Sequence, residues 1–363
     1  MISESEEKNM RWIDMHCDTL SELQKAEDDR RCSGKMKNQG SQQGMLKNDL
    51  CVDIERLSRG GAAAQFFACY VNAAEYPENG AVYPGNGAAY PGERRAYNWN
   101  SAYRAVQEML EYAHQQASSP RSFPGCLVYE AENGRNTAGI LTVEEGGVLD
   151  GDLERLDDLY ERDVRLITLT WNYENCIGYP NSRNRSVMEK GLTHFGKEVV
   201  ERMNDMGMLI DVSHLSDGGF WDCIRCSRTP IVASHSNARS LCAHPRNLSD
   251  EMLRALGNNG GLAGINFYSA FLREEGVADP DDIAAHAAWM IRKSGEDSVA
   301  LGSDFDGFDP DSLPAGIQGV QDMDRVWEAM RREGITPRQI DKIAYENAAR
   351  VINEVCHLAF PFI

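Results

Sequence analysis

The segment DMHCDTL, residues 14–20, places an imidazole and a carboxylate directly after a short apolar run. His16 and Asp18 are separated by one residue, and side chains at positions i and i+2 of a strand point to the same side. The pair could therefore hold a divalent metal ion, or His16 could simply form a hydrogen bond with the neighbouring acid. Further ligands elsewhere in the chain would favour the metal site.

Four other apolar runs also end in a side chain that can bind a metal ion. They lead into Glu144 in TVEEGG, His214 in IDVSHLSD, His235 in IVASHSNAR and Asp304 in LGSDFDG. Mixed imidazole and carboxylate ligands suit zinc or a similar divalent ion, and five ligands with a shared carboxylate suit two ions better than one. Such a pair generates a hydroxide near neutral pH and polarises a carbonyl, which is hydrolytic chemistry.

The elements that must position these residues alternate between β-rich runs and longer stretches of helical periodicity. Strands are predicted over 11–15, 62–70, 138–143, 164–171, 208–213, 230–234, 261–268 and 298–303. Helices are predicted over 97–117, 152–162, 193–207 and 281–295, the last two ending at glycines. Eight strands with helices between them predict an α/β fold, a (β/α)8 TIM barrel, in which the carboxyl ends of the strands meet at one face. An open doubly wound sheet is the alternative.

No linker divides the chain clearly, so residues 1–363 are expected to form a single barrel domain. Loop insertions are predicted near residues 28–44 and 76–95. The second contains three Tyr-Pro pairs spaced seven residues apart, together with Asn-Gly and Pro-Gly turn signals. This segment is either a solvent-exposed loop or an aromatic lid over the mouth of the barrel.

The composition is that of a globular protein with 42% hydrophobic residues and a net charge of −19. Such an acidic chain is not expected to bind nucleic acid or an anionic membrane. No apolar stretch reaches the roughly 18 to 20 residues of a membrane span, and the N-terminal residues are too acidic and polar for a secretory signal. A cytoplasmic location is therefore expected. The ten scattered cysteines are typical of reduced thiols, and Cys223 and Cys226 are expected to share one turn of a helix.

In combination, eight segments resemble the zinc-dependent dipeptidases of the membrane (renal) dipeptidase family. These segments are DMHCDTL, TVEEGG, RLITLTWN, LIDVSHLSD, IVASHSNAR, HPRNLSDEML, ALGSDFDG and YENAARV. They extend from about residue 12 to residue 353. The resemblance implies an amidohydrolase-like metal-dependent barrel that holds two zinc ions, or another divalent metal. It also implies hydrolysis of small dipeptides, often with a D-residue on the carboxyl side.

The resemblance also implies which residues bind the metal ions. By motif position, the ligands of one zinc ion would be His16, Asp18 and Glu144, and those of the other would be Glu144, His214 and His235. Glu144 is followed directly by a second acid, Glu145. The ungapped distance in the family from its glutamate to the end of LTLT selects Glu144 over Glu145 as the shared ligand.

Three further residues receive roles from the resemblance. Arg246 would bind the substrate carboxylate, although the sequence without the resemblance favours a loop cap or a pair with Asp250. Asp304 would be the catalytic acid that carries a proton from the attacking hydroxide toward the leaving amine, and it is preferred to Asp306 because it comes first after the strand. Trp171 stands where the family has a substrate-contacting histidine, and its indole can donate a hydrogen bond but cannot accept a proton or bind metal.

We therefore expect a metallodipeptidase whose partner is a small dipeptide. One alternative is another barrel metallohydrolase that acts on a cyclic amide, a lactone or a phosphoester. A second alternative is a non-catalytic homologue that binds metal. The apolar C-terminal segment HLAFPFI could cover the barrel or form the interface of a homodimer.

Overall fold

Strands and helices alternate along the chain. The computed structural model describes residues 10–32, 43–77, 97–123 and 125–358. The strands are β1 (Trp12–Asp14), β2 (Ala62–Tyr70), β3 (Ser119–Phe123), β4 (Cys126–Glu130), β5 (Asn136–Glu144), β6 (Val164–Thr168), β7 (Leu209–Asp211), β8 (Val232–Ala233), β9 (Leu262–Ile265) and β10 (Val299–Leu301).

The helices that separate the strands differ widely in length. The α-helices are α2 (Thr19–Cys32), α3 (Ile54–Arg59), α4 (Trp99–Gln116), α5 (Leu153–Glu161), α6 (Arg185–Met188), α7 (His194–Met206), α8 (Asp217–Cys226), α9 (Asp250–Asn258), α10 (Ser269–Leu272), α11 (Pro280–Ser294), α12 (Met323–Arg332), α13 (Pro337–Asp341) and α14 (Asn347–Cys356). Short helical turns are η1 (Ala73–Glu75), η3 (Gly146–Leu149), η4 (Pro310–Ser312) and η5 (Val320–Asp322), and η6 (Lys342–Glu346) is a π-helical segment.

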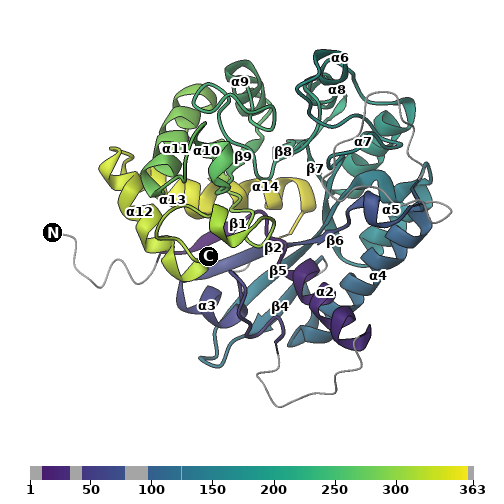
Figure 1. The fold of residues 1–363 in the computed structure, drawn as a ribbon, viewed down its shortest axis with the longest axis horizontal. Coiled ribbons are helices and arrows are strands. Elements are labelled where there is room, and N and C mark those ends of the chain that lie inside the picture. The colour runs from purple at the N-terminus through teal and green to yellow at the C-terminus, as the bar shows by residue number, and fades with distance from the viewer. Residues whose placement is uncertain (1–9, 33–42, 78–96, 124, 359–363) are drawn as a thin grey trace.

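Eight parallel strands close into a barrel (Figure 1). Around the ring the order is β1, β2, β5, β6, β7, β8, β9 and β10, and β10 pairs again with β1. The pairings of β2 with β5 and of β10 with β1 join what would otherwise be two sheet edges. The (β/α)8 barrel predicted from the sequence is confirmed, and the open doubly wound sheet is wrong. Each of the eight predicted runs overlaps one barrel strand.

The sequence did not predict the antiparallel strands β3 and β4, which extend the sheet beside β5. β4 pairs with the first half of β5, where Leu127 lies opposite Gly139. β6 pairs with the second half of the same edge, where Leu141 lies opposite Val164. β3 has the sequence SPRSF, in which polar residues and a proline give no β-strand signal.

The four helices predicted from periodicity are confirmed as α4, α5, α7 and α11. Two of them end where the sequence places a glycine with positive φ, Gly207 at +74° and Gly295 at +92°. The expected insertion near 28–44 begins inside α2, which continues to Cys32. Residues 33–42 and 78–96, where the rest of the two expected insertions fall, lie outside the described residues.

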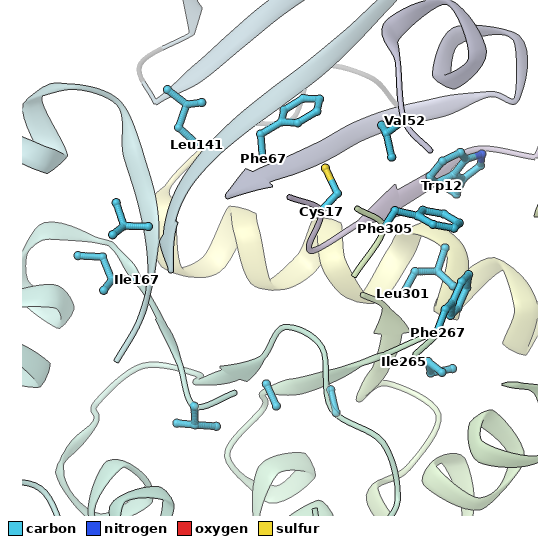
Figure 2. Close-up of a cluster of buried hydrophobic side chains, with 14 of the residues drawn as sticks. Trp12, Cys17, Val52, Phe67, Leu141, Ile167, Ile265, Phe267, Leu301 and Phe305 are labelled. Carbon is cyan, nitrogen blue, oxygen red and sulfur yellow. The ribbon is translucent and has the colours of Figure 1, made fainter. Parts of the chain in front are cut away.

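Two groups of buried apolar side chains hold the barrel together. One lies between the strands and the surrounding helices, and Figure 2 shows members of it such as Phe67, Leu141 and Ile167 on the neighbouring strands β2, β5 and β6. The other joins residues that begin β7 and β9, Leu209 and Leu262, to the apolar face of α14. Because α14 packs against the amino ends of these strands, the carboxyl ends are left to form a site.

The structure also bears on the expectations about the cysteines and about a membrane-spanning helix. Cys223 and Cys226 both lie in α8, as predicted. The nine cysteines whose side chains the structure describes are free thiols. Among the described helices, none combines the length and the apolar character that crossing a bilayer would require.

Candidate metal centre

The carboxyl end of the barrel brings together side chains from both ends of the sequence. Potential ligand atoms of His16, Glu144 and His235 lie within 4.8 Å of one another, and so do those of His16, Asp18 and Asp304. His214 joins the first group, because its Nε2 lies 3.1 Å from Oε1 of Glu144. The structure thus brings together all five ligands expected from the sequence, with Asp304 beside them.

Glu144 stands between two sets of these side chains. Its Oε2 lies 3.4 Å from Nε2 of His16, which itself lies 3.4 Å from Oδ2 of Asp18. Its Oε1 faces the other way, 3.1 Å from Nε2 of His214 and 3.5 Å from Nε2 of His235. One carboxylate with an oxygen in each set is the arrangement that a ligand shared by two metal ions requires.

Strand ends and tight turns aim these side chains at one point. Glu144 is the last residue of β5 and pairs with Tyr70 of β2 on one side and Thr168 of β6 on the other. His214 and Asp304, in the turns after β7 and β10, adopt left-handed backbone angles with φ of +65° and +63°. A non-glycine residue in this region costs on the order of 1–3 kcal/mol, and such residues gather at functional sites.

The electrostatics of the buried carboxylates favour a bound cation. Burial raises the pKa of Asp18 to about 6 and that of Asp304 to about 7. Burial would also raise the pKa of Glu144, but the positive charge of His16 and hydrogen bonds from the imidazoles hold it well below its usual range. Burial together with the charge of Arg246 lowers the pKa of His214 to about 4. The neutral imidazole of His214 beside crowded carboxylates provides the kind of ligands that a divalent ion needs.

Buried polar atoms without hydrogen-bond partners also indicate a bound cation. Both ring nitrogens of His16 and Oδ1 of Asp18 are buried without a hydrogen-bond partner among the described residues. Buried polar atoms are almost always paired, so such an exception calls for an explanation. A divalent ion between Nε2 of His16 and the carboxylates would satisfy Nε2 and the carboxylate of Asp18, and the mixed nitrogen and oxygen donors suit zinc. The residues therefore fit a metal centre.

Arg246 lies directly beside the cluster and is almost completely buried, with 5% of its surface exposed. Its Nη1 donates to Oγ of Ser236 and its Nη2 to the carbonyl oxygen of His235, both at 3.0 Å. The alternative pairing with Asp250 is wrong, because Asp250 instead forms an ion pair with Lys293 at 2.8 Å. Nε of Arg246 has no partner among the described residues.

The two acids of the segment SDFDG occupy different places. Oδ1 of Asp304 lies 3.7 Å from Nε2 of His16, and its Oδ2 accepts a hydrogen bond from the amide of Asn266 at 2.8 Å. Asp306 points away and accepts hydrogen bonds from the hydroxyl of Thr19 at 2.5 Å and the backbone N–H of Cys51 at 2.8 Å. Asp306 therefore anchors the start of α2, whereas Asp304 faces the site.

Trp171 lies at the edge of the cluster, in an aromatic group that also contains Tyr70 and Tyr173. The indole ring centre lies 4.9 Å from that of Tyr70, 5.6 Å from that of Tyr173 and 6.2 Å from that of His214. We call the side chains of Tyr70, Trp171 and Tyr173 the aromatic wall. It borders the side of the centre where His214 lies.

Sequence reasoning missed several side chains that touch this site. Tyr70 closes β2, Asn266 follows β9 and holds Asp304, and Oδ1 of Asn172 lies 3.3 Å from Nδ1 of His214. Tyr70 ends the predicted strand 62–70 and Asn172 directly follows the predicted strand 164–171, so the rule that led to the histidines and acids would have found both. Asn266 lies inside the predicted strand 261–268, because β9 ends at Ile265, before the predicted end.

Comparison with known proteins places the whole chain in one group. A model of the family described as membrane dipeptidase (Peptidase family M19) matches residues 6–360. An uncharacterised dipeptidase of Schizosaccharomyces pombe is 35% identical over 316 residues, which cover 83% of this chain and 71% of that protein. An uncharacterised Klebsiella pneumoniae protein from the pqqA 5′ region is 38% identical over 228 residues, or 60% of this chain and 82% of that protein.

Solved structures agree with the sequence relatives. Dipeptidase AC, a metallopeptidase of family M19, superposes with a TM-score of 0.75 at 26% identity, covering 96% of this chain and 99% of that one. A metallopeptidase from Rhodobacter sphaeroides, liganded with a phosphinate mimic of the dipeptide L-Ala-D-Ala, gives a TM-score of 0.72 at 26% identity with the same coverage of 96% and 99%.

Proposed function

We propose that the chain, which belongs to the membrane dipeptidase family (peptidase family M19), hydrolyses small dipeptides with two zinc ions held at the carboxyl end of its barrel. The observation that carries the two-metal proposal is the position of Glu144. Its two oxygens face two sets of ligands, Oε2 the set of His16 with Asp18 and Oε1 the set of His214 with His235. A carboxylate with a purely structural role would need contacts with only one of these two sets of side chains.

Each set of ligands would hold one ion. The first would lie between His16, Asp18 and Oε2 of Glu144, and the second between Oε1 of Glu144, His214 and His235. Bound ions would polarise the scissile carbonyl and make a water molecule acidic enough to attack it near neutral pH. The buried position of the ligands supports this assignment, because burial strengthens the attraction between carboxylates and a cation.

Arg246 would bind the carboxylate at the C-terminus of the dipeptide. A guanidinium group presents several donors in one plane and is always charged, which suits a carboxylate. Its bonds to Ser236 and to the carbonyl oxygen of His235 hold it beside the second set of ligands. A dipeptide held there would have its peptide bond next to the metal centre.

Asp304 would move the proton. Its Oδ1 faces His16 and its Oδ2 is held by Asn266, so the carboxyl group has a fixed orientation at the site. Burial raises the pKa of Asp304 in the metal-free site, and the positive charge of bound ions would lower it again, so the carboxylate would be ready to accept a proton near neutral pH. It would take the proton of the attacking water and deliver it to the amine nitrogen that leaves.

The aromatic wall would restrict the side chains that the enzyme accepts. Trp171 has a large apolar face and a single N–H donor, and it is packed against Tyr70 and Tyr173, so it narrows the space beside His214. We expect a preference for small side chains. Acceptance of a D-residue on the carboxyl side is supported by the L-Ala-D-Ala mimic bound to the Rhodobacter sphaeroides metallopeptidase.

A substrate panel tests the proposal. The zinc-loaded protein is assayed with L,L- and L,D-dipeptides of Gly, Ala and Leu, with a lactone, a cyclic amide and a phosphoester, and its zinc content is measured. We expect two equivalents of zinc and turnover of dipeptides only. Turnover of another substrate class in preference to dipeptides would contradict the substrate assignment, and one equivalent of zinc in a fully active protein would contradict the two-metal centre.

A further inference from the structure

We propose that Asp211 and Ser234 form a hydrogen-bond relay that fixes the tautomer of His235, so that the Nε2 lone pair of the ring faces Glu144. The inference rests on the proposed metal centre, and it concerns two residues that do not themselves face the ions. Asp211 is the last residue of β7 and Ser234 follows β8, and both are completely buried. They are positioning residues, because they act through His235.

The carboxylate of Asp211 receives four hydrogen bonds. Its Oδ1 accepts from the backbone N–H groups of Ser213 at 2.9 Å and Ser234 at 2.8 Å. Its Oδ2 accepts from the hydroxyls of Thr168 at 2.7 Å and Ser234 at 2.6 Å. An ionised carboxylate can only accept, so both hydroxyl groups must be donors. The single proton of the Ser234 hydroxyl is therefore directed to Asp211.

This direction determines the proton on the imidazole. Oγ of Ser234 lies 2.7 Å from Nδ1 of His235, and with its own proton committed it can only accept from that nitrogen. Nδ1 of His235 therefore carries the hydrogen. The second lone pair of Ser234 Oγ is open to the hydroxyl of Ser213 at 3.3 Å, so every donor and acceptor in the relay is used.

The hydrogen on Nδ1 determines the state of the other ring nitrogen of His235, Nε2. In a neutral imidazole with hydrogen on Nδ1, Nε2 carries a lone pair. That nitrogen lies 3.5 Å from Oε1 of Glu144 and 3.0 Å from Nε2 of His214, where the second ion is proposed to bind. The opposite tautomer would direct an N–H group into the same place and would have to lose it before any metal could bind.

A second buried pair of an aspartate and a serine, Asp14 with Ser303, has no hydrogen bond to an imidazole among the described residues. Asp14 of β1 accepts from the backbone N–H of Ser303 at 2.7 Å and from its hydroxyl at 2.6 Å. The Ser303 oxygen then lies 3.3 Å from the carbonyl oxygen of His16 and from the backbone N–H of Phe305, and no imidazole nitrogen is bonded to it among the described residues. The Asp14 pair positions backbone, whereas the Asp211 pair reaches a ring nitrogen.

Asp211→Asn tests the relay by reversing it. The amide oxygen would remain with the two backbone N–H groups and the NH₂ group would replace Oδ2, so it would donate to Thr168 and Ser234. The hydroxyl of Ser234 would then be free to donate to Nδ1 of His235, which places the ring hydrogen on Nε2. In a catalytic triad of another protein class, the same type of change preserved the geometry and disturbed the tautomer.

The measurement is the ¹⁵N spectrum of the histidine side chains in metal-free protein, with His235 assigned by comparison with His235→Gln. We expect hydrogen on Nδ1 in the natural protein and on Nε2 in Asp211→Asn. Titration with zinc chloride against a competing chelator should show that Asp211→Asn weakens binding of one equivalent by about 10- to 100-fold, the usual effect of removing a residue that orients a metal ligand. A folded Asp211→Asn protein with the natural tautomer and natural zinc affinity would overturn the relay.

Two further substitutions separate the relay from a loss of packing. Thr168→Val removes the other hydroxyl that donates to Oδ2 of Asp211, with little change of volume, and should leave the tautomer and zinc affinity unchanged. Ser234→Thr keeps the hydroxyl and should also behave as the natural protein, whereas Ser234→Ala should lose the single tautomer. This last pair decides the question if Asp211→Asn does not fold, because equal spectra of Ser234→Ala and Ser234→Thr would refute the relay.

The tautomer is measured without metal or substrate, so the relay and the proposed function can fail separately. A natural protein with hydrogen on Nδ1 of His235 but no dipeptidase activity would leave the relay standing and remove the function. An active dipeptidase with hydrogen on Nε2 in the metal-free state would do the opposite.

Discussion

Glu145 is held away from the candidate metal centre by Asn175, whose side-chain amide donates a hydrogen bond to Oε1 of Glu145 at 2.6 Å. The same oxygen accepts from the backbone N–H of Gly147 at 2.8 Å, and Oε2 accepts from the backbone N–H of Trp171 at 3.4 Å. The two consecutive acids therefore have different roles. Glu144 faces the histidines, and Glu145 fastens the loop that carries Trp171 to the end of β5.

Substitution of these two acids should separate metal binding from loop anchoring. Glu144→Gln should lose zinc on dialysis, because a neutral amide cannot replace the charge that both sets of ligands share. Glu145→Gln should keep its zinc and lose about 1–3 kcal/mol of unfolding free energy, the cost of disturbing a buried hydrogen-bonded group. Metal analysis and urea unfolding test this, and loss of zinc from Glu145→Gln instead would show that the wrong acid has been assigned.

Removal of the substrate carboxylate should test the role of Arg246. We expect a C-terminally amidated dipeptide to have a kcat/KM at least about tenfold lower than the free acid, since a hydrogen bond to a charged group contributes about 1.5–3 kcal/mol. The matched control is Arg246→Lys, in which the difference between acid and amide should shrink because the planar group is lost. Equal turnover of acid and amide by the natural enzyme would rule out this role.

Trp171 should set the size of the accepted side chains. Trp171→Ala should raise kcat/KM for Leu dipeptides relative to Gly dipeptides by about tenfold, within the 1–3 kcal/mol that an apolar pocket can contribute to discrimination. Zinc content should not change, because Trp171 is not a ligand. Trp171→His should alter the preference more than it raises the rate.

A matched substitution shows whether this effect belongs to the indole. Tyr173→Phe removes only the hydroxyl that bonds Asn72 at 3.2 Å and keeps the ring of the aromatic wall, so it should retain the natural preference. An inactive natural enzyme that is activated by Trp171→His would indicate a site that has lost its function rather than one adapted to small side chains.

Asp250 should make the stability of the protein depend on pH. Burial would raise its pKa, but hydrogen bonds from Lys293, Trp289 and Ser240 lower it to about 2 from the ordinary value of 3.8. Because the folded-state pKa is the lower one, the stabilisation is present above pH 4 and is lost as the pH falls toward 2. Asp250→Asn should therefore destabilise the protein at pH 6 and destabilise it clearly less at pH 2.5, as measured by urea unfolding.

A comparison of lysine variants supplies the control for this pH effect. Lys293→Met removes the ion-pair partner of Asp250 and should reduce the pH dependence, whereas Lys190→Met, which removes a lysine that lies over the ring of Tyr179, should leave it unchanged. A pH dependence that is the same in Asp250→Asn as in the natural protein would assign the effect to another group.

The barrel could be predicted from the sequence because the signals that define its strands are local. Each strand is a short apolar run with turn signals on either side, and parallel strands must bring their carboxyl ends to one face. This is why the sequence alone predicts that His16 and Asp304, far apart in the chain, lie close together. The strand β3 was missed for the same reason, since its five residues carry no local β-strand signal.

The contacts between neighbouring strand ends could not be predicted in this way. Asp211 bonds Thr168 of β6 and Ser234 after β8, and which side chains meet across three strands depends on their register and on the rotamers at their ends. Hydrophobic periodicity specifies which side of a strand is buried, but it does not specify hydrogen-bond direction. The assignment of a proton to Nδ1 of His235, and the pairing of Asp250 with Lys293 rather than Arg246, therefore came from the folded arrangement of the chain.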